Sequence, residues 1–159
     1  MTRVLRPSTP ANPDFAEAVR ACFARQGLMR TLGASVAAIE PGRVTVEMPV
    51  GPALTQQPGL AHGGAIGAIA EAAGACAALS LLPEAFEVTT VEYKINFVRP
   101  AIGSHLRARA SVVRAGRTVS SVRVEVESGE GDRFSACAIL QATFLAVAPS
   151  DAIASARIE

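Results

Sequence analysis

Residues 56–82 read QQPGLAHGGAIGAIAEAAGACAALSLL, and this stretch decides which fold the chain can adopt. A turn sequence, Gln-Gln-Pro-Gly, leads through His62 and two glycines into a long run of small apolar residues. A helix that is apolar on all sides is typical of a protein core. The stretch therefore predicts a central helix with the other elements packed around it.

Glu71 is the only carboxylate between Glu47 and Glu84, and no lysine or arginine accompanies it. Either it faces water at the edge of its helix, as most glutamates do, or it has a chemical role. Burial of an unpaired carboxylate is costly. The apolar residues around it favour burial and hence the chemical role, and they are Ile66, Ala68, Ile69, Ala70, Ala72 and Ala73.

The composition fits one domain of ordinary size. The chain has 159 residues, half of them hydrophobic and only 4% aromatic, so alanine, valine, leucine and isoleucine must build its core. Residues 1–11, rich in proline, are expected to be a flexible leader, 12–147 a single domain and 148–159 a tail. A net charge of +1 gives no overall field that would attract nucleic acid or an anionic membrane.

Cysteine usage and the N-terminus both indicate a cytoplasmic protein. Cys22, Cys76 and Cys137 are odd in number, far apart and set among apolar residues, which is typical of free thiols in a reducing compartment. The first residues contain arginines and prolines but no apolar segment of the secretory type. A membrane span over Leu60–Leu82 is disfavoured by Glu71 at its centre.

The periodicity of the remaining residues predicts an α+β fold. A helix should begin with Asn12 as its cap and Pro13 at its first position, and end at Gly27. Alternation of apolar and polar residues predicts six strands over 35–40, 43–50, 86–98, 105–114, 117–128 and 133–147. One long helix among antiparallel strands indicates a sheet that wraps the helix.

The strand over 86–98 has two clearly different faces. Val91, Tyr93, Ile95 and Phe97 are expected on one face, and Thr90, Glu92, Lys94 and Asn96 on the other.

The motifs QQPGLAHGG and TTVEYKINFVRPA, with an acidic residue nine places after the histidine, resemble the hotdog-fold acyl-CoA thioesterases of the phenylacetate-pathway type. The resemblance covers about residues 30–147. It implies a hotdog fold, with an extra N-terminal helix in this chain. It also implies a homodimer or a dimer-of-dimers homotetramer whose active sites lie at the subunit interface.

The family's catalytic carboxylate falls on Glu71, where many members have aspartate, so its role as nucleophile or as general base stays open. The family's upstream amide falls on Gln56, with Gln57 as the alternative. Thr90 matches a residue that positions water in the family, although a threonine in a strand can also be plain sheet filler.

The chemistry also points to the helix start. Attack on a thioester creates an oxyanion, and a backbone N–H at the start of a helix is a preorganised donor for it. Gly63 is the expected donor, eight residues before Glu71 and therefore near the same helix face. His62 either orients this turn or acts in catalysis, and without a second ligand at suitable spacing it makes a poor metal site.

Coenzyme A, as part of the substrate, would need local positive charge, and no separate cofactor is expected. Arg99, Arg114 and Arg117 lie at expected strand ends or a hairpin, where they either bind phosphates or are solvated surface charges. Gly64 is assigned to the same binding site. Two other functions fit the motifs: a hotdog-fold enoyl-CoA hydratase or dehydratase that pairs His62 with Glu71, and a non-catalytic acyl-CoA binding module. The acyl group, whether aryl, short or of medium length, stays open.

Overall fold

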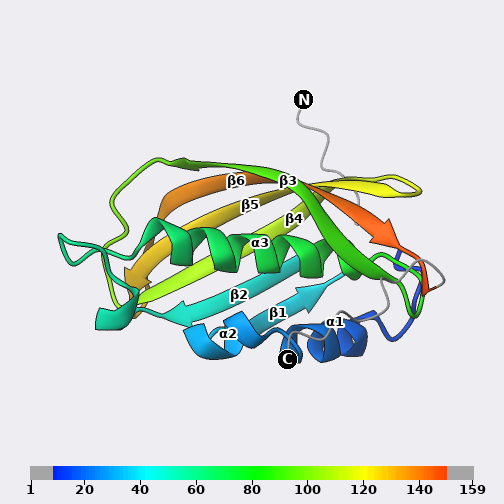
Figure 1. Cartoon of the computed structure of the whole chain (residues 1–159), viewed down its shortest axis with the longest axis horizontal. Coiled ribbons are helices and arrows are strands. Elements are labelled where there is room, and N and C mark those ends of the chain that lie inside the picture. The colour runs from blue at the N-terminus through cyan, green and yellow to red at the C-terminus, as the bar shows by residue number, and fades with distance from the viewer. Residues whose placement is uncertain (1–8, 150–159) are drawn as a thin grey trace, which may run out of the picture.

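The computed structural model describes residues 9–149, so the expectations for the first eight residues and for residues 150–159 lie outside the described residues. Its elements, shown in Figure 1, are helices α1 (Phe15–Ala24) and α2 (Gly27–Leu32), strands β1 (Ser35–Glu40) and β2 (Arg43–Pro49), the short 3₁₀ helix η1 (Pro52–Leu54), helix α3 (Gly63–Leu79), and strands β3 (Glu87–Phe97), β4 (His105–Ala115), β5 (Val119–Glu130) and β6 (Arg133–Val147).

All six strands form one antiparallel sheet with the order β1-β2-β4-β5-β6-β3. The sheet curves around α3, as Figure 1 shows, so the predicted α+β hotdog architecture is confirmed. After α3 the chain crosses to the edge of the sheet opposite β1, so β3 is an edge strand beside β6. The free edge of β3 therefore runs past the central helix.

The core lies between α3 and the concave face of the sheet. Alternate residues of β2, β4 and β5 are buried there, including Val46, Leu106 and Val124. A Cβ on Gly74 would come within 3.0 Å of the ring of Phe144, which is itself 1% exposed. The small residues of α3 thus let the helix backbone lie close to the sheet.

The N-terminal helix differs from its prediction. The Oδ1 of Asn12 accepts a hydrogen bond from the Asp14 N–H at 2.9 Å, but this turn precedes the helix, which begins at Phe15. Gly27 does not end the helix, because α1 already stops at Ala24 and Gly27 is the first residue of α2. A glycine with a left-handed backbone conformation commonly follows a helix, and here it is Gly33 after α2, with φ of 67°.

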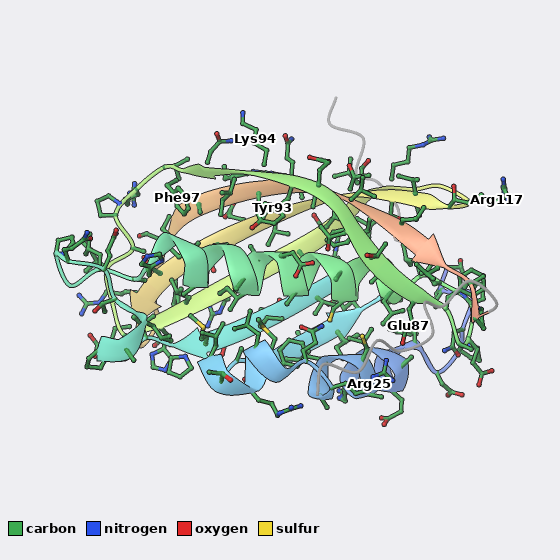
Figure 2. All side chains as sticks on the ribbon, viewed as in Figure 1. Arg25, Glu87, Tyr93, Lys94, Phe97 and Arg117 are labelled. Carbon is green, nitrogen blue, oxygen red and sulfur yellow. The ribbon has the colours of Figure 1, made fainter. Side chains whose placement is uncertain are left out.

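Arg25, which follows α1, forms an ion pair of 2.9 Å with Glu87 at the start of β3, and Figure 2 shows the two side chains together. Both are well exposed, so the pair contributes little to stability.

Within residues 9–149, no helix is both long enough and apolar enough to cross a membrane.

The cysteines are free thiols, as predicted, but they are not equally buried. Cys76 and Cys137 are buried and Cys22 is half-buried. Burial raises the pKa of Cys76 to about 12 from its ordinary value of 9.0, with smaller contributions from Cys22 and Glu71. A thiol that keeps its proton at neutral pH is a poor nucleophile.

The raised pKa of Cys76 predicts a loss of stability in alkali. Above pH 9 the unfolded chain releases this proton while the folded chain keeps it, so the free energy of unfolding falls as the pH rises towards 12. For this one group the slope is at most about 1.4 kcal/mol per pH unit. Urea unfolding between pH 8 and 11 should show a steeper decline for the wild type than for Cys76→Ala, and parallel curves would contradict the prediction.

Candidate active site

The start of α3 presents one backbone N–H without an acceptor. His62 is the N-cap, and its Nδ1 accepts a hydrogen bond of 2.8 Å from the Gly64 N–H. Its carbonyl oxygen accepts from the N–H groups of Ala65 and Ile66 at 3.0 and 3.1 Å. Of the first four N–H groups of the helix, only that of Gly63 has no acceptor among residues 9–149.

The loop before α3 is held in place by its own hydrogen bonds. The His62 N–H donates to the carbonyl of Leu54 at 2.8 Å, and the Ala61 N–H donates to that of Ala101 at 3.4 Å. Gln56 and Leu60 close the predicted turn through a backbone hydrogen bond of 2.9 Å. The position of the Gly63 N–H is therefore fixed by the fold around it.

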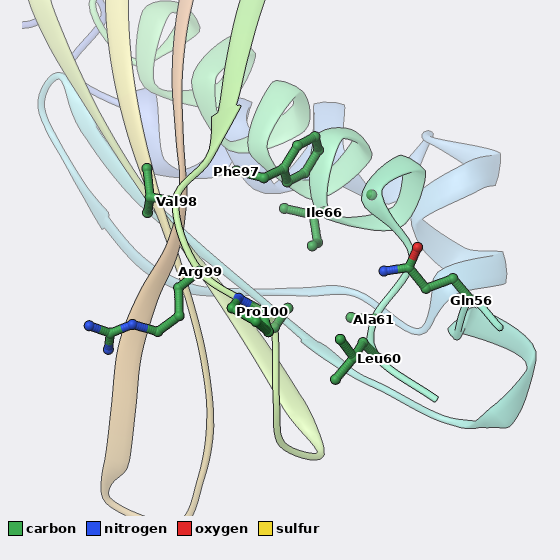
Figure 3. Close-up of a pocket in the computed structure, with 10 residues that line it drawn as sticks. Gln56, Leu60, Ala61, Ile66, Phe97, Val98, Arg99 and Pro100 are labelled. Atoms are coloured by element: carbon green, nitrogen blue, oxygen red, sulfur yellow. The ribbon is translucent and has the colours of Figure 1, made fainter. Parts of the chain in front are cut away.

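A cavity of about 490 Å³ opens beside Gly63. Gln56 lines it together with Gly63, whereas Gln57 is not among its lining residues. In Figure 3 the Phe97 side chain lies beside the first turns of α3, and its ring would be 3.1 Å from a Cβ on Gly63. The lining residues are Gln56, Leu60, Ala61, Gly63, Ile66, Phe97, Val98, Arg99, Pro100 and Ala101.

Glu71 lies further along α3 and is bound by Thr90. The Thr90 Oγ1 donates a hydrogen bond to the Glu71 Oε1. The carboxylate is half-buried rather than fully enclosed, and it lies on the less buried strip of α3 together with Gly64, Ala68 and Ala75. Glu71 is therefore partly buried, as its apolar neighbours favour, and with a specific partner it is not a freely solvated surface charge.

A β-bulge brings Thr90 to Glu71. Thr90 pairs with Phe144 and Glu92 with Thr143, so Val91 is one extra residue in β3. Because of this extra residue, Thr90 faces α3 on the same side as Tyr93 and Phe97. The predicted alternation holds from Glu92 to Phe97, but Thr90 was assigned to the wrong face. Strict alternation cannot reveal a bulge from the sequence.

Tyr93 is a site residue that the sequence did not single out. Its hydroxyl lies 3.7 Å from the position that a Cβ on Gly67 would occupy, so the glycine leaves room for it against the helix. Gly67 is one turn after Gly63 and one turn before Glu71. The phenol therefore lies between the two groups that the chemistry requires.

Gly63 and Glu71 of one chain do not meet. Eight residues of α-helix separate them, which is about 12 Å along the axis. One carbonyl group cannot contact both at about 3 Å, so the two groups of a single chain cannot act on the same carbonyl. The expected placement of the active sites at the subunit interface stays a prediction.

The arginines are distributed over the molecule. The Arg99 side chain extends away from Gln56 in Figure 3, and Arg99 also lines a neighbouring cavity of about 300 Å³ with Arg133 and Glu130. Arg114 and Arg117 belong to the β4–β5 hairpin, and Figure 2 shows Arg117 at the opposite end of the molecule from Phe97. Neither Arg114 nor Arg117 lines the cavity at Gly63 or the neighbouring one. Arg133 was missed because only the β5–β6 turn brings it near Arg99.

Metal ligation has little support in the described part of the chain. Residues 9–149 contain no cluster of three or more histidine, cysteine, aspartate or glutamate side chains that could hold an ion. The Nδ1 of His62 is already used as the acceptor for Gly64.

The site can be compared with known proteins. The family model described as thioesterase superfamily matches residues 58–135. The proofreading thioesterase EntH of Klebsiella pneumoniae is 34% identical over 107 residues, which cover 67% of this chain and 77% of that protein. The crystal structure of a thioesterase family protein from Silicibacter pomeroyi is 41% identical, with a TM-score of 0.81, and the match covers 83% of this chain and 97% of that one. The chain belongs to the thioesterase superfamily.

The PaaI protein from the phenylacetic acid degradation operon of E. coli has the same fold, with a TM-score of 0.76 at 19% identity over 86% of this chain and 96% of that one. That likeness shows the fold alone. The predicted membership of the hotdog-fold thioesterases is confirmed by the family model and by the relatives of 34% and 41% identity, and the protein is a hydrolase that acts on thioesters.

The contact between Thr90 and Glu71 predicts a defect in this thioesterase when the hydroxyl is removed. Thr90→Val keeps the shape of the side chain but leaves the carboxylate without its donor. A hydrogen bond to a charged group contributes about 1.5–3 kcal/mol, so we expect kcat to fall by about 10-fold or more. Thr89→Val, at the exposed neighbouring position, is the matched control and should keep the wild-type kcat. Equal kcat for both variants in a thiol-release assay would contradict a role for the contact.

Proposed function

We propose that this thioesterase hydrolyses an acyl-CoA to the free acid and coenzyme A. The unoccupied Gly63 N–H is the observation that carries the proposal. The partial positive charge at this end of the helix and the free N–H both favour an oxygen that becomes negative. The carbonyl oxygen of a thioester is such an oxygen when its carbon is attacked.

Glu71 acts as the nucleophile or as the general base. It either attacks the carbonyl carbon or removes a proton from the attacking water, and in both cases water adds an oxygen to the acyl group while coenzyme A leaves as the thiol. Thr90 holds the carboxylate through its hydroxyl, and Gln56 binds the carbonyl or the water from the cavity wall. The reaction as proposed uses no cofactor.

A second copy of the chain completes the site. The separation of about 12 Å along α3 means that the Gly63 N–H must act with the partner's Glu71. The free edge of β3 is the surface we assign to this dimer. Its apolar residues are well exposed in the single chain: Val91 (58%), Tyr93 (47%), Phe97 (54%) and Val98 (55%).

Contacts between β3 and α3 support one register for the proposed dimer. Phe97 lies against Gly63, and Thr90 is bound to Glu71. If two β3 edges pair antiparallel with Phe97 opposite the partner's Thr90, the Gly63 N–H lies near the partner's Glu71. A twofold axis repeats the arrangement, so one interface makes two sites. Pairing of two such dimers would give the proposed homotetramer.

The coenzyme A part of the bound substrate would extend from the site towards Arg99. Arg99 lines both the cavity at Gly63 and the neighbouring cavity with Arg133, so the two guanidinium groups are placed to meet phosphates beyond the pantetheine arm. Gly64 contributes by shaping the turn, since its own N–H is bound to His62. Arg114 and Arg117 would contact coenzyme A only if it is bound to another subunit. The free cysteines support the cytoplasm as the location.

Replacement of the carboxylate tests the chemistry. Glu71→Gln keeps the size of the side chain and a partner for Thr90, but it can neither attack nor take a proton, so we expect kcat for acyl-CoA hydrolysis to fall by at least about 100-fold. Glu92→Gln, on the same edge strand and bonded to Thr143, is the matched control. Full thiol release by Glu71→Gln would overturn the assignment.

The same assay separates the alternatives. A hydratase would change an enoyl-CoA without releasing thiol, and a binding module would bind acyl-CoA without turnover. The hydratase would also need His62 as an acid or base, whereas its Nδ1 caps α3.

Complementation tests whether the site is shared between subunits. Gly63→Pro removes the N–H at a helix position that tolerates proline, and Glu71→Gln removes the carboxylate. When the two inactive variants are unfolded and refolded together, mixed dimers contain one site with both native groups. About a quarter of the wild-type activity should return. No recovery, with mixed dimers shown by mass spectrometry, would place both groups in one chain.

A further inference from the structure

Strand β3 contacts one row of helix α3 at three successive points. From the start of the helix, the contacts are Phe97 with Gly63, Tyr93 with Gly67, and Thr90 with Glu71. The three helix residues are four positions apart, so they form one row along the helix. The first and last contacts lie at the carbonyl-binding and carboxylate ends of the proposed mechanism. The middle contact has no role there.

The Tyr93 hydroxyl is held against the helix but forms no hydrogen bond among residues 9–149. Its oxygen lies 3.7 Å from the position that a Cβ on Gly67 would occupy. Figure 2 shows Tyr93 on the side of β3 that faces α3, whereas the next residue, Lys94, extends away from the helix. The polar end of Tyr93 is therefore available to a molecule between β3 and α3.

The Glu71 carboxylate is directed towards the same place. Side chains of an α-helix tilt towards its N-terminus, so that of Glu71 covers the turn that contains Gly67. Thr90 donates to Oε1, which leaves Oε2 for the reaction. In the described chain no direct hydrogen bond joins the phenol to the carboxylate, and a water molecule between them could bond to both.

The dimer proposed above encloses this place. If Gly63 lies opposite the partner's Glu71, the midpoint of the row, Gly67, lies near its own copy at the twofold axis. The midpoint of the proposed β3 pairing falls near residues 93 and 94. Helix and strand spacing thus place the axis beside the same side chain. The second subunit would cover Tyr93, which is 47% exposed in the single chain.

We propose that Tyr93 positions the water molecule that reacts with the acyl group. The water donates one hydrogen bond to Oη of Tyr93 and the other to Oε2 of Glu71, so a lone pair faces the carbonyl carbon held at the partner's Gly63. A water in an enclosed site needs two to four polar partners, and the carboxylate alone provides one. This inference rests on the proposed acyl-CoA hydrolysis and assigns one more residue to it.

The positioned water fits both forms of the mechanism. With Glu71 as general base, the water oxygen bonds to the carbonyl carbon while its proton passes to the carboxylate. The carbon–sulfur bond then breaks, and the sulfur takes that proton. With Glu71 as nucleophile, its oxygen bonds to the carbon and the thiolate leaves first. The water then cleaves the mixed anhydride, and the proton that it loses balances the one taken up by the thiolate.

Removal of the Tyr93 hydroxyl tests the inference. Tyr93→Phe keeps the ring against Gly67 and loses only the oxygen. We expect kcat for acyl-CoA hydrolysis to fall by about 5-fold or more, while KM stays within about twofold of the wild type. Lys94→Met is the matched control, because it removes a polar group from the same edge strand on the face away from α3. It should keep the wild-type kcat.

A second nucleophile separates the positioning of water from support of the fold. Hydroxylamine attacks the acyl group to give a hydroxamic acid and the thiol, and as a stronger nucleophile than water it depends less on being oriented. After subtraction of the reaction without enzyme, Tyr93→Phe should lose less hydroxamate formation than hydrolysis. The ratio of hydroxamate to free acid should therefore rise by about 3-fold or more, and Lys94→Met should keep the wild-type ratio.

The outcomes separate this inference from the proposed function. If the wild type releases thiol and Tyr93→Phe keeps the wild-type kcat, the hydroxyl positions no water. A lower kcat with an unchanged ratio of products would also overturn the inference, since the hydroxyl would then support the carboxylate or the fold instead. If the wild type releases no thiol from any acyl-CoA, the proposed function fails and this inference fails with it.

Discussion

The close approach of α3 to the sheet is the constraint on which the rest of the structure depends. Gly74 has no side chain where the ring of Phe144 lies, and a methyl group there would be within 3.0 Å of it. Gly67 in the same way leaves room for the Tyr93 hydroxyl, and Gly63 lies beside Phe97. Three glycines therefore bring the sheet to the helix along its length, and a helix held this closely presents its N-terminus at a fixed place.

This tight packing also explains why one chain is insufficient for the proposed reaction. A straight helix keeps Gly63 and Glu71 about 12 Å apart, and neither group can shift while the sheet holds the backbone. The bulge at Val91 is the local adjustment that allows both ends of β3 to face the helix, with Phe97 at Gly63 and Thr90 at Glu71. The same strand thus touches both halves of the site, and a twofold axis across its free edge would join the halves of two chains.

The sequence predicted the regular part of the structure well, because alternation and uninterrupted apolar runs are local properties. Each predicted strand has a counterpart whose ends differ by at most two residues, and the central helix lies within the predicted stretch. It predicted less well where one residue changes the pattern. The extra Val91 places Thr90 on the opposite face from the predicted one. Gly27 begins helix α2, although a glycine at this position suggested the end of a helix. The hydrogen bond between Glu71 and Thr90, 19 positions apart, needs that bulge, so only a resemblance could indicate it in advance.

The site residues that the sequence missed have a common cause, since they come from elements far from the motif. Arg133 lines the same cavity as Arg99 because the β5–β6 turn places it there, and Tyr93 lies against Gly67 from the edge strand β3. Neither residue has a type or spacing that distinguishes it from an ordinary surface arginine or strand tyrosine. The motif around Gly63 can fix where a thioester carbonyl binds, but the two arms of the substrate extend beyond it on either side. The proposed chemistry of such a chain is encoded within one turn and one helix, while the residues placed to meet the outer parts of the substrate come from strands and turns far along the sequence.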